Sequence, residues 1–140
     1  MSHKLKLIAI SDREQLASEE LRELFQSGGS YTHHFAVHFD NDEVGLLLLD
    51  FGPLWKYLFL YSLYLVPERR SQGIGTKLMP LIEDIARENG CQEIILKPNP
   101  LGLNPSNPLF PSRKEKLIRF YRRCGYKKDK HPDQMRKSLL

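Results

Sequence analysis

The chain contains a hydrophobic segment that leads through a short polar turn into a glycine-containing helix start. The segment reads Leu63-Tyr64-Leu65-Val66-Pro67-Glu68-Arg69-Arg70-Ser71-Gln72-Gly73-Ile74-Gly75-Thr76. Gly73 and Gly75 allow the backbone to approach a ligand closely, and the amides in the first turn of a helix have no partner within the helix. These amides carry the positive end of the helix dipole, and Arg69 and Arg70 add cationic charge. The segment therefore predicts a phosphate-binding loop.

The glycine spacing separates this loop from the two common nucleotide-binding motifs. A Walker loop requires GxxxxGK followed by Ser or Thr, and a Rossmann fingerprint requires GxGxxG. Residues 70–76 match neither pattern. The sequence therefore indicates a different phosphate-bearing cofactor.

Hydrophobic periodicity predicts the order strand, helix, three strands, helix, strand, helix and two strands. The strands are expected at residues 4–10, 31–39, 44–51, 56–66, 92–97, 125–128 and 134–139, and the helices within residues 11–29, 73–89 and 113–123. Ser11 and Glu14 form a candidate capping box for the first helical region, which comprises one helix or two short ones. Residues 56–66 are expected to form a central strand buried on both faces. Residues 98–112 contain five prolines and predict a long functional or mobile loop.

Length and composition fit one compact domain over residues 1–140. The chain is 41% hydrophobic and 27% charged, which allows one core. The longest nearly apolar stretch, residues 58–66, is far shorter than the roughly 20 residues of a membrane-spanning helix. The N-terminus lacks the apolar region of a secretory signal, and Cys91 and Cys124 form no CxxC pair. We therefore expect no membrane span, no structural zinc, and a cytoplasmic location.

Charge is distributed unevenly along the chain. Residues 113–140 carry 11 Lys and Arg against 3 Asp and Glu, a net +8, whereas residues 1–112 carry a net −4. This asymmetry predicts an anionic partner near the C-terminal end, either a phosphorylated cofactor or a nucleic acid; the alternative is a solvated basic helix and tail.

Three histidines, His33, His34 and His38, raise the question of a metal site. A site on a strand pair needs a third close ligand, which the sequence does not supply. The pattern favours a solvated or substrate-lining surface, and no metal is predicted.

Two motifs of the chain resemble the GNAT superfamily of acyl-CoA-dependent N-acetyltransferases. The segment Arg70-Ser71-Gln72-Gly73-Ile74-Gly75 is similar to the pyrophosphate loop of that family, R/QxxGxG/A, and the preceding Leu63-x-Leu65-Val66-Pro67 belongs to the same pattern. Phe120-Tyr121-Arg122-Arg123-Cys124-Gly125-Tyr126 resembles the signature FYxxxGF of the family's fourth helix. The resemblance covers residues 60–128 by motif and residues 4–140 by element order.

The resemblance implies an α/β fold with a mixed, mainly antiparallel sheet that is flanked by helices and splayed between its fourth and fifth strands. Acetyl-CoA, as co-substrate, would occupy the gap, with Leu63 and Leu65 pairing their backbones with the pantetheine arm. The resemblance assigns the pyrophosphate to the backbone amides of Gln72, Gly73, Gly75 and Thr76, with Arg70 and Ser71 nearby. It also implies that Asn99 contacts the cofactor.

Tyr121 stands where many GNAT members carry a tyrosine that protonates the departing CoA thiolate. A phenol with an ordinary pKa of about 10 is protonated at neutral pH and can donate to a sulfur leaving group. The alternative is a core aromatic residue beside Phe120.

The chain departs from the family pattern at three points. Lys114 and Leu117 replace the asparagine and alanine that usually precede the tyrosine, and residues 56–66 contain no carboxylate to serve as general base. A protonated amine must lose a proton before it attacks a thioester, so a base or a water relay is required. The acidic candidates by position are Asp50, Glu43 and Glu68.

The sequence thus predicts an N-acetyltransferase that moves an acetyl group from acetyl-CoA to a primary amine by direct attack in a ternary complex. The amine belongs to a small molecule or a protein. One alternative is an acyl-CoA-binding module without catalysis, and another, disfavoured because the last helix needs its apolar side for the core, is a nucleic-acid-binding protein. Dimers are common in the family, and a homodimer is a further expectation.

Overall fold

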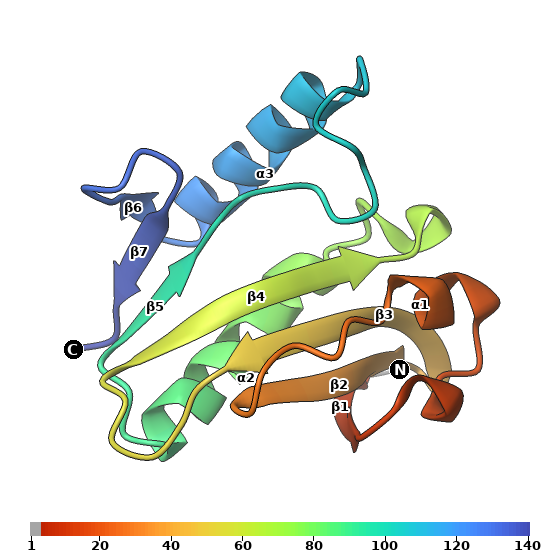
Figure 1. Ribbon diagram of the computed structural model, residues 1–140, viewed down its shortest axis with the longest axis horizontal. Coiled ribbons are helices and arrows are strands. Elements are labelled where there is room, and N and C mark those ends of the chain that lie inside the picture. Colours follow the sequence, from red (N-terminus) through yellow and green to blue (C-terminus); the bar gives the residue numbers. More distant parts are fainter. Residues whose placement is uncertain (1–3) are drawn as a thin grey trace.

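The computed structural model describes residues 4–140 and contains one seven-stranded sheet with the strand order β1-β2-β3-β4-β5-β7-β6 (Figure 1). The elements follow the predicted order. They are β1 (Leu5–Ile10), η1 (Arg13–Gln15), α1 (Glu19–Leu24), β2 (Thr32–Phe39), β3 (Asp42–Asp50), β4 (Tyr57–Leu65), η2 (Pro67–Arg69), α2 (Ile74–Glu88), β5 (Glu93–Leu96), α3 (Phe110–Arg123), β6 (Lys127–Lys128) and β7 (Met135–Ser138).

The sheet is antiparallel except at one place. Strands β4 and β5 run parallel and pair from Tyr57 with Glu93 to Leu60 with Leu96. Strand β5 ends there, whereas β4 continues to Leu65. The C-terminal half of β4 therefore has a strand partner only on the β3 side, and the sheet is open between β4 and the chain that follows β5 (Figure 1).

A β-bulge lies in β4 next to this opening. Leu48 of β3 pairs with Ser62 and Leu49 pairs with Leu60, which leaves Tyr61 as an extra residue. The extra residue shifts the alternation of side chains, so that Leu60 and then Leu63 pack toward the same core. Without the bulge, the second half of β4 would present its leucines to the opposite face.

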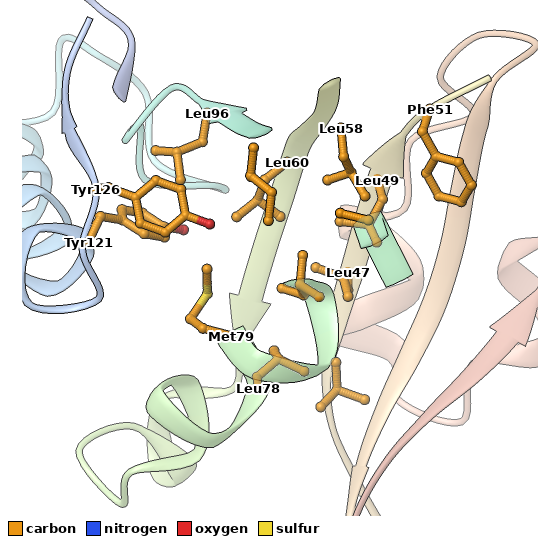
Figure 2. Packing of buried hydrophobic residues seen from close by; sticks show 14 of the residues in the cluster. Leu47, Leu49, Phe51, Leu58, Leu60, Leu78, Met79, Leu96, Tyr121 and Tyr126 are labelled. Atoms are coloured by element: carbon orange, nitrogen blue, oxygen red, sulfur yellow. The ribbon is translucent and has the colours of Figure 1, made fainter. Parts of the chain in front are cut away.

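Helices cover both faces of the sheet. Helices α2 and α3 share one core with Leu47 and Leu49 of β3, and Figure 2 shows these leucines between β4 and α2. Helix α1 and Leu16, the residue that follows the 3-10 helix η1, cover Leu46 and Leu48 on the other face, as part of a second cluster. Strand β3 is therefore buried on both faces and is the centre of the core. No helix within residues 4–140 is long and apolar enough to cross a membrane.

Four details differ from the sequence-based expectations. The strand expected to be buried on both faces, β4, is only partly buried beyond Leu60, because it faces the opening in the sheet. Helix α1 ends at Leu24, ahead of the glycines at 28 and 29, and α3 begins at Phe110 within the expected loop. The capping box also lies one residue further along than the expected pair of Ser11 and Glu14. The Asp12 side chain accepts from the Glu14 amide, and the Gln15 side chain accepts from the Asp12 amide.

We expect Leu47→Ala to lower the free energy of unfolding by about 2–5 kcal/mol, because the fully buried side chain leaves a cavity in a tightly packed core. Leu54→Ala is the matched control. Leu54 is 97% exposed, and its truncation should change stability by less than about 0.5 kcal/mol. Urea unfolding measures both variants. Equal losses in the two variants would contradict the assignment of β3 as the centre of the core.

Candidate active site

A cavity of about 1040 Å³ lies at the opening of the sheet. Its wall is formed by α1, the C-terminal half of β4, the loop between β4 and α2, the first turn of α2, residues 100–103, and α3. A Cβ atom on Gly102 would lie 3.0 Å from a methyl carbon of Leu24, so the 98–109 loop closely approaches α1 on this side. The cavity thus joins segments that are distant in sequence.

The phosphate-loop candidate has an unusual backbone. Ser71 and Gly73 both adopt left-handed conformations, with φ of 64° and 78°. Gly73 is the N-cap of α2, and the Lys77 amide donates to its carbonyl in the first bond of the helix. The amides of the first turn therefore have no acceptor within the helix. Gly73, Gly75 and Thr76 all line the cavity.

Two arginines hold this loop in place. Arg70 donates from Nε to the Leu65 carbonyl at 2.9 Å, and its guanidinium lies 5.0 Å from the ring centre of Tyr64. Arg69 forms an ion pair with Asp42 at 2.5 Å. Both arginines line the cavity, but their side chains are also bonded to other groups of the protein. Their main structural role is to tie the loop to β4 and to the β2–β3 turn.

The backbone edge of β4 faces the opening at Leu63 and Leu65. The Val66 amide donates to the Val44 carbonyl of the preceding hairpin at 2.9 Å, so Val66 points its backbone groups toward β3. Backbone groups alternate between the two sides along a strand, which turns those of Leu65 and Leu63 the other way. Strand β5 has already ended at Leu96, opposite Leu60. The Leu63 amide and carbonyl and the Leu65 amide therefore face the cavity, whereas the Leu65 carbonyl already accepts from Arg70.

Gly75 contributes a close contact between two helices. A Cβ atom at this position would lie 3.0 Å from Cζ of Phe120 on α3. Glycine therefore lets the first turn of α2 approach the Phe120 ring, which itself lines the cavity. Gly73, in contrast, has open space around it and is required by its positive φ.

Helix α3 presents both an aromatic and a basic surface to the cavity. Tyr121 lines the wall but is only 5% exposed, and burial raises the pKa of its phenol above the ordinary value. Its ring contacts Phe120 at 5.1 Å and Tyr126 at 5.6 Å, centre to centre. Four cationic side chains of the same helix also line the cavity: Arg113, Lys116, Arg119 and Arg123. The excess of positive charge after residue 112 was the sequence signal for these four residues.

The cavity has two carboxylates, Glu20 and Glu23, both on α1. Tyr64 donates a hydrogen bond to Glu20, and burial and this bond raise the pKa of the Tyr64 phenol. The sequence did not identify either glutamate. It placed both in the helical region within residues 11–29 but did not predict which way their side chains face.

The acidic candidates named from the sequence lie outside the cavity wall. Asp50 accepts from the Thr32 hydroxyl at 2.6 Å. Glu43 accepts from the Ala17 and Ser18 amides at 2.9 Å each, and Glu68 does not line the cavity. We therefore assign no base from this group.

Two of the residues expected to bind a cofactor are not on the cavity wall. The Gln72 side chain donates back to the Glu68 carbonyl at 3.0 Å, which leaves its backbone amide as the group able to act at the loop. Asn99 is exposed, and its amide donates to the Lys97 carbonyl at 2.8 Å. Residues 100–103 line the cavity where Asn99 was expected.

Two of the three histidines, His33 and His34, stack on aromatic rings. His33 stacks on Phe51 at 3.9 Å, and His34 stacks on Phe25 at 4.5 Å. Within residues 4–140, no group of three or more His, Cys, Asp or Glu side chains is placed to hold a metal ion.

A sequence model of the acetyltransferase (GNAT) family matches residues 5–126. The chain belongs to the GNAT family. A search of curated proteins gives no significant match. The arrangement of the sheet, with its parallel β4–β5 pair and the opening beside it, is the GNAT fold.

Solved GNAT structures resemble the chain over nearly its whole length. The PaiA N-acetyltransferase of Thermoplasma acidophilum, in complex with coenzyme A, is 20% identical, with a TM-score of 0.62 and coverage of 99% of this chain and 100% of that one. A GNAT acetyltransferase of Elizabethkingia anophelis with acetyl-CoA bound is 13% identical, with a TM-score of 0.64 and coverage of 96% and 98%. The IAA acetyltransferase of Bacillus cereus is 12% identical, with a TM-score of 0.68 and coverage of 99% and 100%.

We expect Arg70→Lys to lower the free energy of unfolding by about 1 kcal/mol, because lysine lacks the Nε donor that bonds the Leu65 carbonyl. The matched control is Arg119→Lys, an exposed position on the cavity wall, where the change should stay within about 0.5 kcal/mol. Urea unfolding measures both. No difference between the two variants would show that Arg70 does not anchor the loop.

Proposed function

We propose that this GNAT protein is an N-acetyltransferase that transfers an acetyl group from acetyl-CoA to a primary amine within a ternary complex. One observation carries the proposal. The free amides at the start of α2 and the unpaired backbone edge of β4 line the same cavity, so one extended ligand with a phosphate end and an amide-containing arm can use both. Coenzyme A has this chemistry.

The pyrophosphate of acetyl-CoA would bind at the start of α2. The backbone amides of Gln72, Gly73, Gly75 and Thr76 supply the donors there, with Ser71 beside them. The four cations of α3 lie on the same cavity wall and add positive charge for the phosphates. This use of the basic C-terminal region favours a phosphorylated cofactor over a nucleic acid as its anionic partner.

The pantetheine arm would continue along β4 as an added strand. Its amide groups can pair with the backbone of Leu63 and with the Leu65 amide, which β5 leaves free, while the Leu65 carbonyl accepts from Arg70. The arm then leads toward Leu60, the last residue of β4 that pairs with β5. This direction brings the thioester to the point where β4 and β5 separate, after Leu60 and Leu96. We call this point the fork of the sheet, and it lies next to the bulge at Tyr61.

At the fork, a neutral amine attacks the thioester carbonyl carbon, and a β4 amide near the bulge stabilises the oxyanion that develops. The carbon–sulfur bond then breaks, and its electron pair goes to sulfur. We assign Tyr121 as the acid that protonates the thiolate, because it lines the cavity and a phenol is protonated at neutral pH. Holding both substrates in one orientation supplies much of the remaining rate acceleration.

A second candidate function is an acyl-CoA-binding module without catalysis. The position of the carboxylates favours this function. Glu20 is hydrogen-bonded to Tyr64, which lies four residues along β4 from Leu60, so Glu20 is not placed at the fork to take the proton of the amine. A binding module would bind acetyl-CoA but acetylate no amine. The two functions are therefore separated by assaying product CoA over a panel of small and peptide amines.

We expect Gly75→Val to weaken acetyl-CoA binding by at least about tenfold, because the added side chain meets the Phe120 ring and fills space at the first turn of α2. Gly29→Val is the control, since Gly29 has open space and no positive φ. Gln72→Ala should leave affinity nearly unchanged, because the Gln72 side chain is bonded to the Glu68 carbonyl and only its backbone amide is assigned to the cofactor. Calorimetric titration of folded variants measures all three. Equal affinity in wild type and Gly75→Val would refute the proposed cofactor position.

We expect Tyr121→Phe to lower kcat by about a hundredfold or more while leaving the dissociation constant of acetyl-CoA within about twofold, because the hydroxyl acts only as the thiolate forms. Steady-state assays with the best amine of the panel, together with calorimetric titration, separate the two effects. An unchanged kcat would remove Tyr121 from the catalytic role.

A further inference from the structure

Tyr126, directly before β6, has a buried hydroxyl group without a partner. The residue is 2% exposed, and its Oη atom makes no hydrogen bond to any group within residues 4–140. Buried polar atoms in folded proteins are nearly always hydrogen-bonded, because an unpaired one loses its water without compensation. Phenylalanine would fill the same space without that cost. The hydroxyl therefore does not stabilise the ligand-free fold, and it is available to bind a partner during the reaction.

The charged neighbours of Tyr126, Lys137 and Glu83, are bonded to each other. Lys137 lies 5.9 Å from its ring centre, but the Lys137 ammonium donates to Glu83 at 3.0 Å and to the Cys124 carbonyl at 2.8 Å. Burial raises the pKa of the Cys124 thiol, which is therefore protonated at neutral pH. The remaining titratable neighbour is Tyr121, whose ring meets that of Tyr126 edge to face at 5.6 Å.

The two phenols point in the same direction. Figure 2 shows their hydroxyl ends on the same side of the ring pair, directed toward β4 at Leu60. Leu60 and Leu96 form the last pair of the β4–β5 ladder, so this direction leads to the fork of the sheet. Tyr121 lines the cavity and Tyr126 does not. Tyr121 thus lies between the cavity and Tyr126.

We propose that Tyr126 is a positioning residue for Tyr121: its hydroxyl donates a hydrogen bond to the Tyr121 oxygen when Tyr121 gives its proton to the CoA thiolate. This inference rests on the proposed function, because it assigns a second residue to the same reaction. The two rings are in edge-to-face contact, and the structure leaves the Tyr126 hydroxyl without another partner within residues 4–140, so it is available for this bond.

The proton balance of the step is closed. The carbon–sulfur bond breaks and its electron pair moves to sulfur, which takes the hydroxyl proton of Tyr121. The electron pair of that O–H bond stays on the Tyr121 oxygen, where the Tyr126 hydroxyl stabilises it without transferring its own proton. The amide nitrogen of the product releases one proton to water, and water returns one proton to Tyr121.

The surroundings explain why a second hydroxyl is useful. The Tyr121 phenolate would form among buried apolar groups, and burial already raises the pKa of this phenol. A neutral O–H donor stabilises the phenolate without bringing a permanent charge into the core. The nearby Lys137 does not serve this purpose, because its ammonium group is held by Glu83 and the Cys124 carbonyl.

The first test is a double-mutant cycle on kcat. We expect Tyr126→Phe to lower kcat about tenfold in the wild-type background, with an unchanged KM for acetyl-CoA, and to have no effect in the Tyr121→Phe background. Tyr31→Phe removes the same atom from an exposed tyrosine that packs on Trp55, and should leave kcat unchanged. The melting temperature of Tyr126→Phe should not fall, because no bond is lost. Equal effects of Tyr126→Phe in both backgrounds would overturn the proposal.

The second test needs no acceptor amine. In the complex with CoA itself, a donor to the thiolate lowers the pKa of the bound thiol, which ultraviolet absorbance of the thiolate follows during a pH titration. We expect the pKa of the bound thiol to be lower in wild type than in Tyr126→Phe, and this difference to vanish in the Tyr121→Phe background. Identical thiol titrations in wild type and Tyr126→Phe would overturn the proposal. If no amine is acetylated, the proposed transferase function fails, while this titration still decides whether the two phenols act on the thiol.

Discussion

The short parallel pairing between β4 and β5 determines the architecture of the site. Hydrogen bonding stops after Leu60 and Leu96, and β4 continues alone on that side to Leu65. An unpaired strand edge inside a protein is costly unless another group satisfies it. The edge here borders a cavity of about 1040 Å³, which can admit an extended ligand that completes the ladder. The phosphate loop follows β4 directly, so the same strand leads to both ends of the proposed cofactor site.

Packing on the two faces of the sheet keeps this opening in place. Strand β3 is buried on both sides and anchors β4, while α2 and α3 share the core beneath the cavity. The contact between Gly75 and Phe120 sets the distance between the start of α2 and α3. Arg70 joins the loop to the Leu65 carbonyl, next to the edge that the pantetheine arm would use. The cofactor side of the site is therefore shaped by contacts within the protein itself.

The sequence predicted the order of all ten main elements, because each strand and helix carries its own period and turn residues. It also identified Gly73 and Gly75. Why each must be glycine depends on the three-dimensional structure, because Gly73 has a positive φ and Gly75 lies in a close contact between two helices. The bulge at Tyr61 left a signal that was missed, since Leu58 and Leu60 are followed by Leu63 and Leu65 with two residues between the pairs. The glutamates of α1 and the side-chain position of Gln72 depend on tertiary packing and could not be read from local patterns.

The position of the cofactor is best tested by amide hydrogen exchange, measured residue by residue with and without acetyl-CoA. If the cofactor binds as proposed, acetyl-CoA slows exchange at Leu63 and Gly75, whose amides have no backbone partner within residues 4–140, and leaves Leu7 in the β1–β2 ladder unchanged. Protection at these two amides would place the cofactor along β4 and at the start of α2. Unchanged exchange at both amides, at a concentration of acetyl-CoA that saturates the protein, would show that the cofactor does not bind along β4 and at the start of α2.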